Sequence, residues 1–168
     1  MTYRILYMKV PAIDIEKLIW TQPQRDIRAT ALPLFCSLQM EFAQFRIARP
    51  TDNFEKIKEF YGKGLELPII GSFEGHAGYD GIMFGLPDNK FHLEFTTHID
   101  GSPCPAPTKD NLLVFYIPDQ ERISIIVNRL GKMGYHPVEP ENPYWKEKGI
   151  TIEDPDKWRI VLMNGEYK

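Results

Sequence analysis

The alternation of apolar and polar residues predicts two copies of one structural module downstream of Glu41. A first strand is expected at 42–49, where apolar residues recur at nearly every second position. Pro50 ends this strand, and Thr51 or Asp52 can cap the helix that follows. The apolar stripe of that helix has helical spacing and comprises Phe54, Ile57, Phe60, Tyr61 and Leu65. Three more strands are expected at 67–73, 81–86 and 91–97.

The same order of elements returns after a polar, proline-rich linker at 101–111. A strand is expected at 112–117, and Pro118-Asp119 then leads into a helix that ends at Gly134. The apolar positions of this helix are Ile123, Ile126, Val127, Leu130 and Met133. Strands at 135–138, 149–153 and 158–163 complete the copy.

Proline landmarks support an internal duplication. Pro50 and Pro118 precede the two helices, and Pro87 and Pro155 precede the two last strands. Both pairs are separated by 68 positions. Two independent landmarks at one offset indicate a repeated module.

The last strand of the first copy carries two ionisable side chains inside an apolar run. Successive side chains of a strand alternate between its faces, so His92 and Glu94 should point the same way. Phe91, Leu93 and Phe95 should then pack on the opposite face.

Residues 1–40 sustain neither the helical nor the strand period, and little function is expected from them. They are interpreted either as a genuine N-terminal extension or as the result of a start upstream of a natural Met40. The predicted organisation is therefore an extension at 1–40, a first module at 41–104 and a second module at 105–168.

Composition narrows the classes of function. The 168 residues suffice for one domain, or for two small modules that share a core. A net charge of −3 gives no electrostatic case for a nucleic-acid partner, and no apolar run is long enough to span a membrane. The cysteines, Cys36 and Cys104, form no CxxC motif, which favours a cytoplasmic protein with reduced thiols.

Five segments jointly carry a family resemblance: RIARPTDNFEKIKEFYGKGLEL, GYDGIMFGLPDNKFHLEF, LLVFYIPD, NPYWKEKG and ITIEDPDKWRIVLMN. Between Glu41 and about Gly165 the chain resembles the vicinal oxygen chelate superfamily of glyoxalases, bleomycin-resistance proteins, fosfomycin-resistance transferases and extradiol dioxygenases. Within it, the chain is most similar to small bacterial proteins of the YycE type. The resemblance implies an α+β fold in which two tandem βαβββ modules form curved mixed-sheet half-barrels around a central cavity. It also implies a homodimer.

Metal-dependent members of that superfamily place a ligand, often His, in the first strand of each module, and commonly a Glu in a last strand. The matching positions here are Phe45 or Arg46 (counting favours Arg46), Glu94, Leu113 or Val114, and Val161 or Leu162. Only Glu94 is a metal ligand, whereas a catalytic ion needs about three protein ligands. No cofactor is therefore expected. A divalent metal held by an unusual His92–Glu94 pair is the alternative.

Six side chains are candidates for the functional site. Arg46 and Glu94 either form a salt bridge at the vacated metal position, or keep that pair while Arg46 holds an anion and Glu94 acts as acceptor or base. His92 shares their face and is interpreted as a core histidine or a ligand contact. Tyr116 lies on a strand. Tyr144 and Trp145 lie in a loop, where aromatic rings can stack on a flat ligand.

Two classes of function remain open. One is a glyoxalase- or bleomycin-resistance-like protein that binds a small organic molecule in its cavity without metal. The other is an enzyme, a lyase, isomerase or transferase, that uses Glu94 as general base or as part of an unusual metal site. Loss of the family's ligand residues favours the binding protein.

Overall fold

The structure is a computed structural model that describes residues 43–86 and 91–166. The chain divides into two units, Met1–Met40 and Glu41–Lys168, and every element named below belongs to the second unit. Residues 1–40 and the predicted turn at 87–90 lie outside the described residues.

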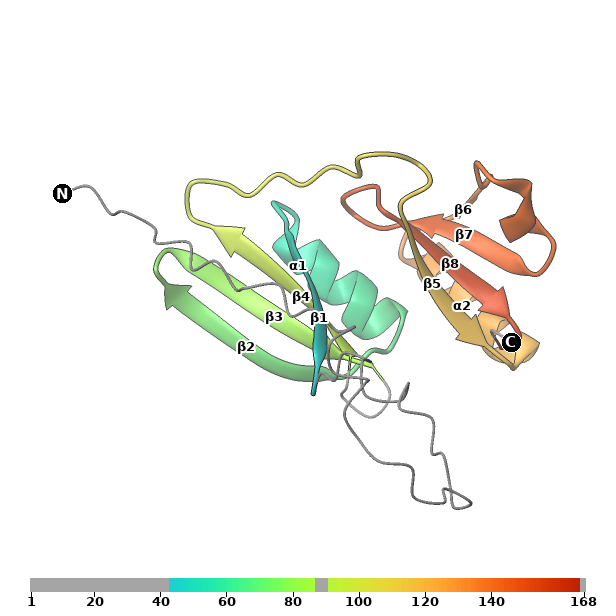
Figure 1. Cartoon of the computed structure of the whole chain (residues 1–168), viewed down its shortest axis with the longest axis horizontal. Helices are drawn as coiled ribbons and strands as arrows, with labels where there is room; N and C mark the ends of the chain where they lie inside the picture. The colour runs from blue at the N-terminus through green and yellow to red at the C-terminus, as the bar shows by residue number, and fades with distance from the viewer. Residues whose placement is uncertain (1–42, 87–90, 167–168) are drawn as a thin grey trace, which may run out of the picture. The chain divides into compact units, whose positions relative to one another are not determined.

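The first module forms one four-stranded sheet, here sheet A, with its helix on one face (Figure 1). Its elements are β1 (Phe45–Pro50), α1 (Phe54–Ile57), η3 (Lys58–Gly64), β2 (Ile69–His76), β3 (Tyr79–Gly85) and β4 (Phe91–His98). The spatial order is β1-β4-β3-β2, with β1 parallel to β4 and the other neighbours antiparallel. The predicted strand–helix–strand–strand–strand order is confirmed.

The second module repeats this topology in sheet B, with the order β5-β8-β7-β6. Its elements are β5 (Leu112–Ile117), α2 (Gln120–Lys132), β6 (Pro137–Val138), η5 (Pro143–Lys146), β7 (Gly149–Glu153) and β8 (Arg159–Asn164). Again the first and last strands are parallel. Asp119 caps α2 because its carboxylate accepts a hydrogen bond from the Glu121 N–H.

The first helix differs from the prediction. Only four residues are α-helical, and the chain then widens into the π-helical segment η3. Asn53 is the N-cap and makes no side-chain cap bond, whereas Thr51 instead accepts from the Asn53 N–H. A Cβ at Gly64 would lie 2.5 Å from Leu130 Cδ2, so glycine permits the close approach of η3 to α2.

The helix-bearing faces of both sheets share one hydrophobic core. Leu93 and Phe95 are buried on the face of sheet A that carries the helix, as predicted; Phe91 is half exposed. The core residues are Ile57, Phe60, Tyr61, Leu65, Ile82, Phe84, Leu93 and Phe95 of the first module, with Ile123, Ile126, Leu130, Ile152, Ile160 and Leu162 of the second. Burial of both apolar faces in a common core joins the modules.

A buried polar cluster, here the junction cluster, also links the modules. Arg49 Nη2 donates to Asp154 Oδ2 at 2.7 Å, and the Tyr61 hydroxyl donates to the same oxygen at 2.9 Å. Asp154 Oδ1 accepts from the backbone N–H groups of Asp156 and Trp158. The Arg49 guanidinium lies 4.4 Å from the Trp158 ring centroid. Burial and the neighbouring carboxylate raise the pKa of Tyr61 well above its usual value, so Tyr61 remains a neutral donor.

Candidate functional site

The candidate site lies on the face of sheet A that does not carry the helix, here the helix-free face. Strand register places Arg46 beside His92 and Ala48 beside Glu94 on the parallel strands β1 and β4. On the other side of β4, Met83 pairs with Glu94 across an antiparallel ladder. His92 and Glu94 therefore share a face, as the alternation predicted.

The Arg46 guanidinium bridges His92 and Glu94 and forms the polar end of this face. Arg46 Nε donates to His92 Nε2 at 2.7 Å, and Nη1 donates to Glu94 Oε2 at 2.8 Å. His92 and Glu94 are buried, whereas the Arg46 side chain is 50% exposed. The ion pair expected between Arg46 and Glu94 is thus present, and it leaves part of the guanidinium open to a ligand.

The bond from Arg46 also defines the tautomer of a neutral His92 ring. Because Nε2 accepts a hydrogen bond, neutral His92 carries its proton on Nδ1. That Nδ1 atom is buried and has no hydrogen-bond partner in the part of the chain that the structure describes. Burial of a donor without an acceptor is costly.

Aromatic side chains gather farther along the same face, here the aromatic end, and sequence reasoning missed them. Phe73 of β2 lies over Gly81 of β3, where a Cβ would come within 2.2 Å of its ring. Tyr79 stands opposite His98, and their ring centroids are 4.5 Å apart. The glycine-rich pattern around Tyr79 and Asp80 is typical of a connection, but both residues belong to β3. The feature of the sequence that could have indicated this arrangement is Gly81, because a glycine on one strand leaves room for an aromatic ring on the paired strand.

The remaining predicted site residues lie in the second module. Tyr116 and Tyr144 line a hollow of about 480 Å³ together with Met163 and Asn164. Trp145 contacts the Tyr144 ring edge-on, at a centroid separation of 4.9 Å. The six candidates thus divide into two groups, one in each module of the chain.

The internal repeat identifies the counterparts of the polar end in sheet B. Val114 pairs with Val161, and Tyr116 pairs with Met163, as Arg46 pairs with His92 and Ala48 with Glu94. With Val114 as the counterpart of Arg46, that of Glu94 is Met163, rather than Val161 or Leu162 as the sequence suggested. The second module therefore offers apolar side chains at these positions.

The donor set does not fit the metal of the superfamily. Residues 43–86 and 91–166 contain no group of three or more His, Cys, Asp or Glu side chains that could hold an ion. His92 and Glu94 are only two ligands, and both are already bound by the Arg46 guanidinium. A catalytic divalent ion needs about three protein ligands. Among the described residues, His92 and Glu94 therefore do not by themselves make up the ligand set of a catalytic ion.

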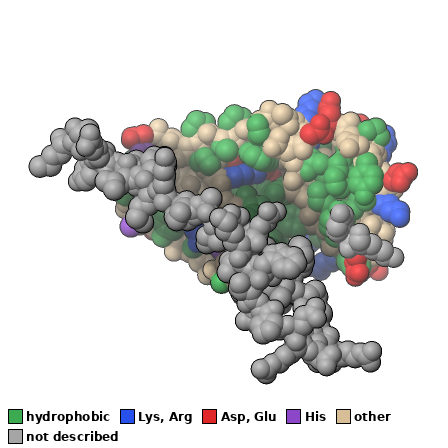
Figure 2. Space-filling view, in the orientation of Figure 1, with side chains coloured by type: hydrophobic (Ala, Val, Ile, Leu, Met, Phe, Trp, Pro, Cys, Tyr) green, Lys and Arg blue, Asp and Glu red, His purple; other side chains and the backbone are tan. Residues whose placement is uncertain are grey.

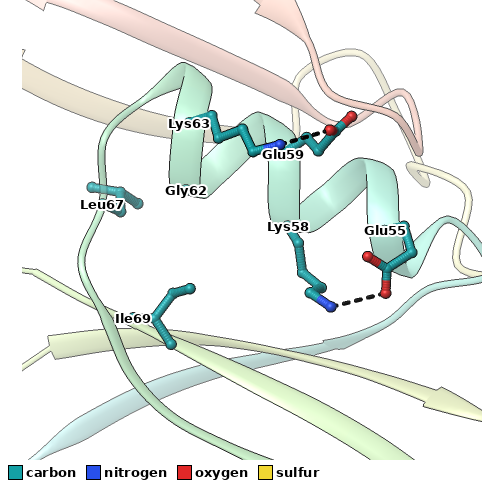
Figure 3. Close-up of a pocket in the computed structure, with 7 residues that line it drawn as sticks. All are labelled: Glu55, Lys58, Glu59, Gly62, Lys63, Leu67 and Ile69. Atoms are coloured by element: carbon teal, nitrogen blue, oxygen red, sulfur yellow. Dashed lines mark hydrogen bonds and ion pairs between the residues drawn. The ribbon is translucent and has the colours of Figure 1, made fainter.

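Two other hollows carry charges that are already paired. One, of about 630 Å³, is mainly apolar, and the charged residue in its lining, Arg122, is bonded to Glu66. Hydrogen bonds from Arg129, and its charge, lower the pKa of Glu66. The other, of about 440 Å³, runs beside η3, and Figure 3 shows its rim pairs, Lys58–Glu55 and Lys63–Glu59. In both hollows these charged side chains are already paired, whereas Arg46 at the polar end keeps a nitrogen, Nη2, without a partner among the described residues.

The protein has the glyoxalase/bleomycin-resistance fold of the vicinal oxygen chelate superfamily. It consists of two β-α-β-β-β modules in which the first and last strands pair in parallel, and solved structures of this fold match it. Family models for the YycE-like N-terminal and C-terminal domains match residues 45–96 and 110–164. The chain is 55% identical to the Bacillus subtilis protein YycE over 124 residues, which is 74% of this chain and 89% of that protein. The chain belongs to the YycE-like family.

Solved structures agree. The crystal structure of Bacillus subtilis YycE has 54% identity and a TM-score of 0.72, covering 75% of this chain and 92% of that one. The fosfomycin resistance protein FosX of Mesorhizobium loti matches with a TM-score of 0.57 over 77% of this chain and 94% of its own, at 14% identity. Leishmania major glyoxalase I, a trypanothione-dependent enzyme, matches at 0.56 and 16% identity over 71% of this chain and 84% of its own. The last two similarities show the fold alone.

The Bacillus subtilis catechol-2,3-dioxygenase is a more distant relative. It is 25% identical over 151 residues, which is 88% of this chain and 47% of that protein.

In the described part of the chain, no helix is long and apolar enough to cross a membrane.

Proposed function

We propose that this protein binds a small organic anion on the helix-free face of sheet A, without a metal ion, and that Arg46 is the residue that holds the anion. Its setting is the cytoplasm, and it uses neither nucleic acid nor membrane as a partner. The observation that carries the proposal is the half-exposed Arg46 guanidinium, held in place by buried His92 and Glu94.

The geometry supports an anion for three reasons. Arg46 uses Nε for His92 and Nη1 for Glu94, which leaves Nη2 without a partner among the described residues. The two bonds fix the guanidinium plane, so little side-chain entropy remains to be lost on binding. The unpaired Nδ1–H of His92 adds a second donor at the same end.

The alternative is catalysis with Glu94 as general base. One observation favours it: the Glu94 carboxylate is buried beside a histidine, an arrangement common to acid–base sites. Because Oε2 is bound to Arg46, the ion pair would have to open, or proton transfer would have to use Oε1. Turnover of a ligand that is lost in Glu94→Gln, with binding retained, would favour this alternative.

Binding of benzoate, a simple flat carboxylate, tests the role of Arg46. Arg46→Gln is expected to weaken benzoate binding roughly tenfold or more, because a charge-assisted hydrogen bond is lost. Isothermal titration calorimetry measures the change. Arg122→Gln is the matched control, since Arg122 is 51% exposed but is already paired with Glu66. Equal affinities of wild type and Arg46→Gln would contradict the proposal.

We also propose that the protein is a homodimer. In each sheet an outer strand, β1 or β5, lies at the edge of the strand order, and exposed strand edges invite pairing with another chain. Large apolar side chains are exposed next to that edge of sheet A: Phe45, Ile47 and Phe91. Hydrophobic side chains reach the surface in several places (Figure 2). A second copy would cover them.

A charge placed on β1 tests the dimer. Ile47→Lys is expected to shift the protein from dimer to monomer at micromolar concentration, because burial of an unpaired ammonium at an interface is unfavourable. Analytical ultracentrifugation reads the mass directly. Ile125→Lys is the control, since Ile125 is exposed on a helix, α2, and not on a strand. A wild-type protein that sediments as a monomer would refute the dimer.

A further inference from the structure

We propose that the bound molecule is an elongated aromatic carboxylate, whose carboxylate meets Arg46 and whose ring lies at the aromatic end, against Phe73 and Tyr79. This inference rests on the proposed function and adds the class of ligand and the residues that select it.

Phe73 provides a flat apolar surface. Its ring lies on the bare backbone of Gly81, because glycine has no Cβ to hold the ring away. Phe73 is only half buried, so the ring is open to further contact. An aromatic ring of a ligand can pack against it face to edge or in an offset stack.

Tyr79 and His98 extend this surface along the same face. The Tyr79 side chain is exposed, and its ring leans on that of His98. His98 lies four positions beyond Glu94 on β4, which corresponds to about 13 Å along a strand. Met83, paired with Glu94, lies between the two ends. A ligand that touches both ends must therefore be longer than one benzene ring.

Charge sets the orientation of the ligand. The polar end holds two donors, the half-exposed Arg46 guanidinium and the buried, unpaired Nδ1–H of His92, and one carboxylate, Glu94, whose Oε2 is bound to Arg46. At the aromatic end the carboxylate of Asp100 lies 3.7 Å from His98 Nδ1. A ligand carboxylate occupies the polar end because Nη2 of Arg46 is still available to bind it there, although Glu94 is bound to Nη1, whereas the aromatic end presents the carboxylate of Asp100.

Three probes separate length from charge: biphenyl-4-carboxylate, benzoate and biphenyl-4-methanol. We expect biphenyl-4-carboxylate to bind roughly five- to tenfold more tightly than benzoate, because its second ring reaches Phe73. Phe73→Leu should remove most of that advantage and leave benzoate affinity unchanged. Arg46→Gln should weaken both carboxylates and leave biphenyl-4-methanol unchanged. Calorimetry gives the affinities, and magnetisation transfer from the Met83 methyl group to the probe reports its position.

Tyr144→Leu is the matched control, because Tyr144 is an exposed aromatic residue of the other hollow. It should leave the affinity of biphenyl-4-carboxylate unchanged. Equal affinities for the two carboxylates, or an advantage that survives Phe73→Leu, would overturn this inference while the Arg46 effect upheld the proposed function. Affinities that are indifferent to Arg46→Gln would overturn both.

Discussion

Replacement of Asp154 by alanine is expected to lower the free energy of unfolding by about 3–5 kcal/mol, because it breaks the buried ion pair with Arg49 and leaves the guanidinium with the longer contact, 3.7 Å, to Asp156 Oδ2. Asp154 is 1% exposed, and its two oxygens accept four hydrogen bonds, including one from the Tyr61 hydroxyl. The variant also loses the oxygen that accepts from the Tyr61 hydroxyl and the oxygen that accepts from the backbone N–H groups of Asp156 and Trp158, in the turn before β8. Urea denaturation, followed by tryptophan fluorescence, measures the change.

A double variant separates the lost charge pair from lost packing. Arg49→Met with Asp154→Leu should be less destabilised than Asp154→Ala alone, since the Arg49 charge is then removed together with that of Asp154, although Asp156, 3.7 Å from Arg49, also loses its cationic neighbour. Glu59→Ala serves as a surface control: it breaks the exposed pair with Lys63 and should cost no more than about 0.5 kcal/mol. If Asp154→Ala were as mild as Glu59→Ala, the junction cluster would not hold the modules together.

Much of the fold could be predicted because periodicity reports burial. His92 and Glu94 alternate with Leu93 and Phe95, so the strand and its two faces were readable from the sequence. The offset of 68 residues indicated the duplication, since equivalent turns recur at equivalent places. The Arg46–Glu94 pair was accessible because a buried carboxylate requires a partner.

Other features depend on packing that no local pattern encodes. Tyr79 lies in a glycine-rich stretch typical of a connection, whereas Phe73 ends a predicted strand, and only the pairing of β2 with β3 puts them on one face. The junction cluster joins Arg49 to Asp154, 105 positions away, and the sequence contained nothing to match them. The placement of Tyr116 and Tyr144 in one hollow of the second module also depends on tertiary packing. Long-range contacts of this kind were beyond sequence reasoning.

Replacement of Arg46 by histidine is expected to create a divalent-metal site at the position that the Arg46 guanidinium occupies in the wild-type protein. The guanidinium now lies between His92 Nε2 and Glu94 Oε2, at 2.7 and 2.8 Å. An imidazole at position 46 would give two histidines and one carboxylate, a set that suits Zn, Ni, Co and Fe(II). At an ion concentration 100-fold above the dissociation constant, folding gains about 2.7 kcal/mol. The thermal midpoint should then rise by roughly 5–10 °C.

Metal content and thermal midpoints of four proteins decide the outcome. The wild type and Arg46→Gln should show no shift with added ions, because two ligands do not make a closed site. Arg46→His should bind one ion per chain, and Arg46→His with Glu94→Gln should lose it. An ion bound by the wild type and absent from Glu94→Gln would refute the metal-free proposal. If Arg46→His bound none, the prediction that an imidazole at position 46 completes a ligand set with His92 and Glu94 would be wrong.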